Sequence, residues 1–395
     1  MEALARMGLS IDFEAHNARV KRVWQAFRES NPTRVPMTLG ISQRFTLLNP
    51  EANQLAITWE EYFHDPEAML QAQLQHQHWV RHNVIYDAEL GLPEAWVVNV
   101  DFQNTWGPME YGAEPRFVEG NVPDAMPIIG DDGKQAFIEE GSPELFTGWM
   151  GRSWEYYEYM RDRAEGYEFH GRPVRVGNPA GLRPAPLFTL ACGLRGATEL
   201  CLDLREDPEF VHALMATLTR HTIRRLYALR RRLERPMQSH TLHYGDDSVA
   251  LLSPEAYREF VLPYHKRLFD EFGAEGPNSI HLCGDATHLF KTIRDELRVM
   301  TFDTGFPVDH GRLRRELGPE VTIQGGPHAD LILRGSPRQV RDETIRILQS
   351  GVMQGGRFIL REGNNLAPGT PLLNVQAMYD ACRQFGRYED RPGEM

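Results

Sequence analysis

The sequence predicts an α/β protein, a distorted (β/α)8 TIM barrel with N-terminal insertions that cover one mouth of the barrel. Three observations support this prediction. Eight short apolar runs are each followed by glycine, proline or a polar turn, helical segments alternate with these runs in the second half, and polar residues follow nearly every run. Strands that alternate with helices of about ten to fifteen residues give a parallel sheet, and eight such units close into a barrel.

The elements follow in chain order. An amphipathic helix is predicted over residues 11–30, ending before Asn31-Pro32 because proline disfavours helix in the residue before it. The eight predicted strands are the apolar runs 35–39, 96–100, 174–176, 241–244, 279–283, 299–302, 321–324 and 358–360. The predicted helices of the second half are 208–232, 254–272, 286–296, 312–317, 337–349 and 373–385.

The first 170 residues fit this alternation less well. The stretch from Asp101 to Tyr167 contains several glycines, prolines and tryptophans, and Trp106–Gly112 resembles a hairpin. We interpret residues 1–170 as the start of the barrel with lid-like insertions, so that residues 1–395 form a single domain.

Composition narrows the class of protein. Of 395 residues, 41% are hydrophobic and 25% are charged, as in soluble globular proteins, and the net charge of -12 argues against a general nucleic-acid binder. The arginines at 224–225 and 230–232 are predicted to form the solvated face of a helix. The sequence contains no run of about eighteen apolar residues, so it predicts no membrane span. Met1–Arg6 lacks an apolar signal core, and the four cysteines are scattered, so we expect reduced thiols and a cytoplasmic protein.

The run Ser279–Leu282 leads into the most informative motif, His281-Leu282-Cys283-Gly284. Residues i and i+2 of a strand point the same way, so His281 and Cys283 are expected to face one spot. Imidazole and thiolate are both good zinc ligands. The alternative is a buried cysteine beside a histidine that bonds a backbone carbonyl.

In a parallel barrel, the residues that follow the strands converge on one pocket. The residues at these positions are Asp101, Asn178, Asp246, Asp247, His281, Cys283, Asp303, Gln324, Glu362 and Asn364. Asp and Asn are also ordinary turn and cap residues, which would account for Asp303 and Asn178. Adjacent acids repel each other, so a buried member of the Asp246-Asp247 pair needs a cationic or metal partner. Arg44 and Arg361 are further candidates, as ligands of a substrate carboxylate.

Several of these pieces occur in an order typical of one family. They are the stretch 202–208 (Leu-Asp-Leu-Arg-Glu-Asp-Pro), Asp246-Asp247 with 252–257, His281–Gly284, Gln324–Gly326, and Pro371 with Asn374. With them, residues 177–388 resemble the uroporphyrinogen decarboxylase superfamily, and residues 171–390 are the best-matched part of the chain. The resemblance implies a distorted eight-stranded barrel and one of two chemistries, tetrapyrrole decarboxylation or zinc-dependent methyl transfer with a corrinoid protein or similar carrier.

The decarboxylase branch holds its substrate with an arginine-rich N-terminal loop, but Gly40–Arg44 contains one arginine. Its tyrosine position falls at Cys192 or Gly193, and its histidine position at Asn364. The methyltransferase branch has His-x-Cys-Gly, which matches His281 and Cys283, but its third zinc ligand, a cysteine, also falls at Asn364. Neutral asparagine is a poor zinc ligand, so Glu362, Asp246 or Asp247 is expected to supply an oxygen.

The sequence therefore favours a zinc-dependent methyltransferase or demethylase that moves a methyl group between a small methylated substrate and a corrinoid or similar carrier. The expected catalytic residues are Asp246, Asp247 and Glu362, the substrate-binding residues are Arg44, Asp101, Asn178, Gln324 and Asn364, and the metal ligands are His281, Cys283 and Glu362. A homodimer is also compatible with the family. Two alternatives stay open: a metal-free decarboxylase of a uroporphyrinogen-like or smaller carboxylated substrate that uses Asp247 as acid or base, and a silent member that binds a corrinoid or tetrapyrrole.

Overall fold

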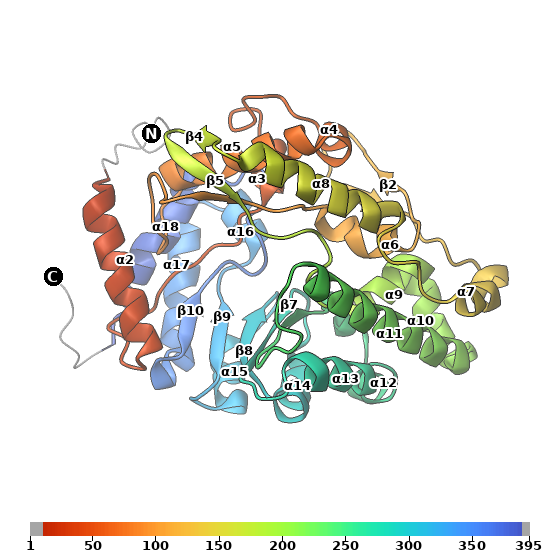
Figure 1. Ribbon diagram of the computed structural model, residues 1–395. Coiled ribbons are helices and arrows are strands. Elements are labelled where there is room, and N and C mark those ends of the chain that lie inside the picture. The colour runs from red at the N-terminus through yellow and green to blue at the C-terminus, as the bar shows by residue number, and fades with distance from the viewer. Residues whose placement is uncertain (1–10, 389–395) are drawn as a thin grey trace.

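The computed structural model describes residues 11–388, which form an α/β fold (Figure 1). Met1–Arg6, where the sequence has no apolar signal core, lies outside the described residues. The strands are β1 (Trp96–Val98), β2 (Pro115–Arg116), β3 (Asp124–Ala125), β4 (Glu168–Phe169), β5 (Arg172–Val176), β6 (His243–Gly245), β7 (Asn278–Leu282), β8 (Val299–Thr304), β9 (Thr322–Gly325) and β10 (Phe358–Leu360).

The strands form three sheets. The largest is parallel and has the order β10-β9-β8-β7-β6, while a second has the order β1-β5-β4, with β1 parallel to β5. Strands β2 and β3 form a small antiparallel ribbon. Among residues 11–388, strand pairing does not close the two larger sheets into one ring, so the structure confirms the α/β class and leaves the closed barrel unconfirmed.

The predicted strands are largely confirmed. Seven of the eight apolar runs contain a strand, and the eighth, 35–39, contributes a parallel bridge from Met37 to Leu360. Its ladder is short because Pro36 has no N–H to donate: Leu360 N–H donates to Pro36 O at 2.9 Å, and Thr38 N–H donates to Leu360 O at 2.9 Å.

The helices surround these sheets (Figure 1). They are α2 (Phe13–Arg28), α3 (Gln43–Leu47), α4 (Trp59–His64), α5 (Pro66–Asn83), α6 (Trp106–Glu110), α7 (Lys134–Glu140), α8 (Gly148–Ala164), α9 (Leu187–Arg195), α10 (Ala197–Glu206), α11 (Pro208–Arg232), α12 (Pro254–Phe260), α13 (Leu262–Phe272), α14 (Phe290–Leu297), α15 (His310–Leu317), α16 (Ala329–Arg334), α17 (Pro337–Ile347) and α18 (Leu372–Phe385).

Two expectations about these elements are wrong. The predicted helix 254–272 is two helices, because Val261 leaves helical geometry (φ -123°) and Pro263 lies in the first turn of α13. The expected hairpin at Trp106–Gly112 is the short helix α6. Pro108 is tolerated there because the first N–H groups of a helix have no partner within it.

Two apolar clusters form the core. One lies around the five-stranded sheet and includes Ile280, Phe302 and Leu360. The other is rich in aromatic residues and joins α4, α5 and α8 to β1 and β5, with Trp96 and Phe102 at its centre. The first 170 residues thus contribute most of the second cluster, which Val174 and Leu229 complete, and a wall above the large sheet.

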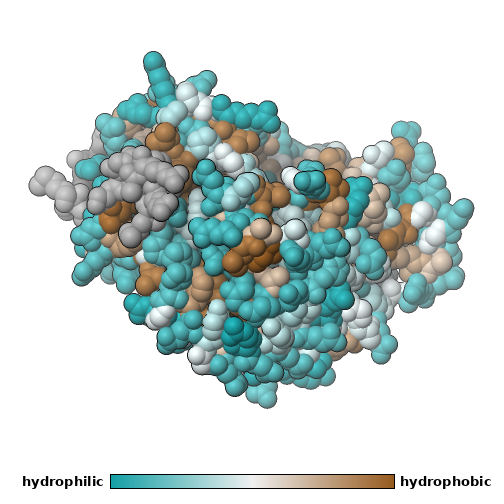
Figure 2. Space-filling view, turned by 90° about the horizontal axis from the view of Figure 1, so that it is seen from above, coloured by the Kyte–Doolittle hydropathy of each residue, from teal (hydrophilic) through white to brown (hydrophobic). Residues whose placement is uncertain are grey.

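On the face seen in Figure 2, hydrophilic residues cover most of the surface and hydrophobic residues form several separate patches. Within residues 11–388, no helix combines the length and the apolar character needed to cross a membrane. All four cysteines are free thiols.

Candidate active site

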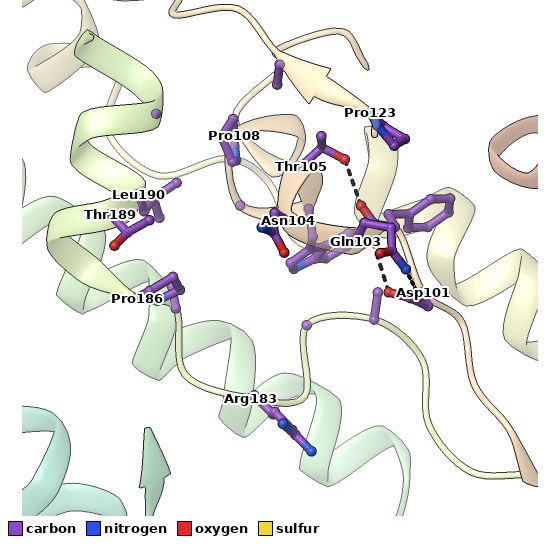
Figure 3. Close-up of a pocket in the computed structure, with 18 of the residues that line it drawn as sticks. Asp101, Gln103, Asn104, Thr105, Pro108, Pro123, Arg183, Pro186, Thr189 and Leu190 are labelled. Carbon is purple, nitrogen blue, oxygen red and sulfur yellow. Dashed lines mark hydrogen bonds between the residues drawn. The ribbon is translucent and has the colours of Figure 1, made fainter. Parts of the chain in front are cut away.

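A cavity of about 1380 Å³ lies between the N-terminal insertions and the end of β6. Its walls come from the β2–β3 ribbon, the segment Val100–Pro108, the loop Asn178–Pro186 and the start of α9. Figure 3 shows Asp101, Gln103 and Asn104 on one side, and Pro186, Thr189 and Leu190 of the α9 region on the other. Asp247, immediately after β6, also lines it.

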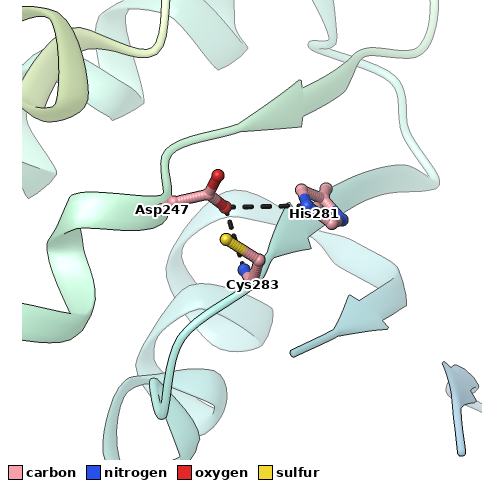
Figure 4. Close-up of side chains that lie close together, drawn as sticks. All are labelled: Asp247, His281 and Cys283. Carbon is pink, nitrogen blue, oxygen red and sulfur yellow. Dashed lines mark hydrogen bonds and ion pairs between the residues drawn. The ribbon is translucent and has the colours of Figure 1, made fainter. Parts of the chain in front are cut away.

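Next to the cavity, Asp247, His281 and Cys283 come together (Figure 4). One ligand atom from each lies within 4.8 Å of those of the other two. Parallel pairing of β6 with β7 places Gly245 opposite His281, which brings the residues after β6 beside the end of β7. The expectation that His281 and Cys283 face one spot is therefore confirmed.

Asp247 connects this cluster to the cavity. Its Oδ1 accepts a hydrogen bond from the Cys283 N–H at 2.9 Å and lies 3.7 Å from Nε2 of His281. Its side chain is 41% exposed, so the carboxylate can turn toward a ligand. One imidazole nitrogen, one thiol sulfur and one carboxylate oxygen form a donor set that fits zinc.

His281 is held from its other side by Asp303. Nδ1 of His281 lies 2.8 Å from Oδ2 of Asp303, its register partner on β8. Burial lowers the pKa of His281, but the hydrogen bond and charge of Asp303 and the charge of Asp247 outweigh burial, so the pKa lies above 6.5. The interpretation of Asp303 as a turn or cap residue is wrong, because Asp303 lies within β8 and its carboxylate contacts His281 and Arg361.

The environment of the Cys283 thiol favours its protonated form. Burial, and then the charge of Asp247, raise the pKa of Cys283 to about 12. A metal ion that binds here must therefore displace that proton. The site also needs a close approach of two loops: a Cβ on Gly305 would lie 1.9 Å from Cys283 O, so only glycine fits at position 305.

Asp246 has a different environment from its neighbour. It is fully buried and accepts hydrogen bonds from Phe188 N–H (2.8 Å), Thr189 N–H (2.7 Å) and Thr189 Oγ1 (2.7 Å), which fixes the start of α9. Nε2 of His265 lies 2.9 Å from Oδ2. The cationic or hydrogen-bonding partner that a buried acid requires is thus present, and Asp246 anchors α9 instead of facing the cavity.

Glu362 lies outside the cluster of Asp247, His281 and Cys283. It is fully buried, its Oε1 accepts from Gly40 N–H at 2.7 Å and Nε of Arg361 lies 3.3 Å away. Burial raises the pKa of Glu362 to about 8, despite the opposing effects of Arg361 and the Gly40 N–H. The structure therefore offers Asp247, rather than Glu362, as the oxygen donor beside His281 and Cys283.

The remaining predicted substrate-binding residues separate into two groups. Arg44, Asp101 and Asn178 line the cavity, and Oδ1 of Asn178 is buried without a hydrogen-bond partner. Gln324 lies opposite Asp303 on β9, and the Asn364 carbonyl accepts from Arg361 at 3.2 Å; neither residue lines the cavity.

Arg44 and Asp101 meet at Gln103. Nε of Arg44 donates to Oε1 of Gln103 at 3.0 Å, and the Gln103 side-chain amide donates to Asp101. Burial raises the pKa of Asp101 even though Gln103 and Tyr62 donate hydrogen bonds to it. Gln103 therefore links two of the residues that line the cavity, Arg44 and Asp101.

The role of Arg225 was not predicted from the sequence. The expected solvated arginine face is wrong at this position, because Arg225 is buried and ion-paired with Glu110. Its Nε and Nη2 donate to the carbonyls of Gly181 (2.9 Å) and Arg183 (2.8 Å), which holds the cavity loop. The signal in the sequence is that the apolar residues Ala228 and Leu229 follow Arg225 at i+3 and i+4, which places all three on one face of α11.

Comparisons with known proteins agree with this architecture. The sequence model of a family described as Uroporphyrinogen decarboxylase (URO-D) matches residues 181–385, slightly more than half of the chain. A methylated-thiol--coenzyme M methyltransferase from Methanosarcina mazei is 32% identical over 209 residues, covering 51% of this chain and 53% of that relative. A uroporphyrinogen decarboxylase from Anaeromyxobacter dehalogenans is 27% identical over 228 residues, covering 58% of this chain and 60% of that relative.

The chain thus spans about half the length of the curated relatives that it matches. Among solved structures, a methyltransferase from Methanosarcina mazei has the same overall fold, with a TM-score of 0.58 and 17% sequence identity. That likeness covers 93% of this chain and 98% of the other, so it includes the N-terminal insertions.

Proposed function

The chain belongs to the uroporphyrinogen decarboxylase family, and within that family we propose that it is a zinc-dependent methyltransferase or demethylase. It moves a methyl group between a small methylated substrate and a corrinoid or similar carrier. The observation that supports this function is the convergence of Asp247, His281 and Cys283. The methyltransferase name of the Methanosarcina relative points the same way.

In this proposal His281 Nε2, the Cys283 thiol and the Asp247 carboxylate hold the ion. Zinc, when bound, supplies Lewis acidity toward the heteroatom that carries the methyl group. Asp247 takes the role of oxygen ligand that the sequence analysis gave to Glu362. Glu362 is instead a buried acid in contact with Arg361. An oxygen among the donors makes the site harder than an all-sulfur site, which favours an alkoxide or phenolate over a thiolate as the methylated atom.

The cavity provides room for the substrate and for part of a carrier. Ligand cavities usually measure about 300–1000 Å³, and this cavity is about 1380 Å³. Arg44 offers a guanidinium to an anionic group of the substrate, and Asn178 Oδ1 offers an acceptor to a donor group. Gln324 and Asn364 do not line this cavity and stay candidates at the neighbouring strand ends.

The direct test is the metal content of protein purified without a chelator. We expect about one zinc ion per chain in the wild type, and loss of that zinc in His281→Ala and in Cys283→Ala. Cys201→Ala, which removes a partly exposed free thiol on α10, is the matched control and should keep the zinc. A zinc-free wild type that cannot be loaded with zinc would reject the proposal.

A metal-free decarboxylase is the second candidate, favoured by the names of the Anaeromyxobacter relatives. It predicts release of carbon dioxide from a carboxylated substrate in the presence of a chelator, with Asp247 as acid or base. Methyl transfer to or from free cobalamin, followed by its absorption spectrum, distinguishes the first candidate. The cytoplasmic location and the homodimer stay predictions.

A further inference from the structure

We propose that Asp303 is the positioning residue of the candidate zinc site, because it fixes the ring and tautomer of His281 so that Nε2 faces the ion. This inference rests on the proposed function. It concerns a residue that does not itself reach the cluster of Asp247, His281 and Cys283.

The geometry around His281 supports this role. Oδ2 of Asp303 lies 2.8 Å from Nδ1, whereas Nε2 is directed toward Asp247 Oδ1 at 3.7 Å. An ionised carboxylate accepts hydrogen bonds and donates none, so Nδ1 carries the proton of the neutral ring. The lone pair is then on Nε2, on the side where Asp247 and Cys283 lie. A ligating histidine commonly donates its other N–H to a carboxylate in this way.

Asp303 is in turn held by the end of β10. Arg361 Nη1 pairs with the same Oδ2, and Arg361 also bonds Asn364 O at 3.2 Å and lies 3.3 Å from Glu362 Oε1. The Asp303 side chain is 9% exposed, so few other orientations are open to it. The contact between Asp303 and His281 follows from the strand register, because His281, Asp303 and Gln324 occupy paired positions on β7, β8 and β9.

These contacts assign the three neighbouring acids separate roles. Asp247 is the oxygen donor, Asp303 orients the imidazole, and Glu362 receives Arg361 and the Gly40 N–H. The Oδ1 atom of Asp303 has no hydrogen-bond partner among the described residues, so Oδ2 makes the contacts to both His281 and Arg361. Loss of the Asp303 carboxylate would free the ring to rotate or to adopt the other tautomer.

The experiment measures zinc affinity of the full chain by competition with a coloured chelator. Asp303→Ala and Asp303→Asn are each expected to weaken zinc binding by about 10- to 100-fold. Asparagine keeps the shape, but its amide N–H2 can face Nδ1 and select the wrong tautomer. Cobalt(II) loaded in place of zinc gives a second readout, since its absorption bands report a changed ligand set.

Asp203→Asn is the matched control, because Asp203 is also a buried aspartate paired with an arginine, Arg195, but lies outside the cluster. It should keep the wild-type zinc affinity and cobalt spectrum. If Asp303→Ala does not fold, the zinc affinity of Asp303→Asn tests the role of Asp303. A folded Asp303 variant with wild-type zinc affinity would overturn the role of Asp303 alone, whereas a wild type that binds no zinc would overturn this role together with the proposed function.

Discussion

At the scale of single residues, Asp246 and Asp247 show how the position of a carboxylate determines its role. The two are adjacent, yet one is fully buried against α9 and the other is 41% exposed beside the cavity. Extended backbone turns successive side chains to opposite sides, which separates them. Asp246 therefore stabilises the fold, while Asp247 is available for a ligand.

Glu362 gives a prediction about pH at the same scale. Its folded pKa of about 8 lies above the ordinary 4.5, so the folded protein holds this proton more tightly than the unfolded chain. Its contribution to stability is present below about pH 4.5 and is lost as the pH rises through about 8. Glu362→Gln has no charge to bury and keeps an oxygen for the Gly40 N–H.

We expect Glu362→Gln to match the wild type near pH 5 and to be more stable by roughly 3–5 kcal/mol at pH 9. Urea unfolding at the two pH values measures the difference. An equal effect of the substitution at both pH values would contradict the raised pKa.

At the scale of elements, the sequence predicted those whose boundaries are set locally. The helix 208–232 was found with its observed bounds, because Asp207 caps it and Pro208 occupies its first turn. The strand 358–360 was found because it is a short apolar run that a polar turn ends. The break at Val261 was missed although Pro263 marks it in the sequence, and α6 was missed because its glycine and proline are also typical of a hairpin turn.

The candidate site follows the same division. His281 and Cys283 could be paired from the sequence because Cys283 directly follows the strand that contains His281, and extended backbone puts residues i and i+2 on one side. The third member could not, because it depends on how β6 and β7 are registered, and Asp246, Asp247 and Glu362 were all open. The contact of Asp303 with His281 likewise required the register of β7 and β8.

Arg225 on α11 gives a prediction at the scale of elements. It joins α11 to α6 through Glu110 and to the cavity loop through the carbonyls of Gly181 and Arg183. Arg225→Met leaves the Glu110 charge buried with one partner fewer, so we expect a loss of about 3–5 kcal/mol in the free energy of unfolding. Limited proteolysis should also cut the loop 178–186 faster.

Its neighbour Arg224 is the matched control. Arg224 is exposed, and Arg224→Met is expected to change stability by no more than about 0.5 kcal/mol. Chemical denaturation of both variants measures the contrast. Equal stability of the two variants would mean that Arg225 does not secure the cavity wall.

At the scale of the whole molecule, contacts far apart in sequence join the N-terminal part to the rest. Trp96 pairs with Val174 between β1 and β5, and Met37 bridges Leu360 of β10. Asp87 forms an ion pair with Arg34 and accepts from the Tyr379 hydroxyl of α18 at 3.2 Å. These contacts favour the prediction that residues 1–395 form a single domain.

That prediction has a direct consequence for a shortened chain. Residues 171–388 alone would expose Leu360 and Val174, both buried in the full chain, and would leave two strand edges unpaired. We expect this fragment to lack a cooperative unfolding transition and a near-ultraviolet circular dichroism signal, whereas the full chain unfolds in one transition. Co-expression with residues 11–170 should restore both signals. Cooperative unfolding of the fragment by itself would show instead that the first 170 residues are a separable domain.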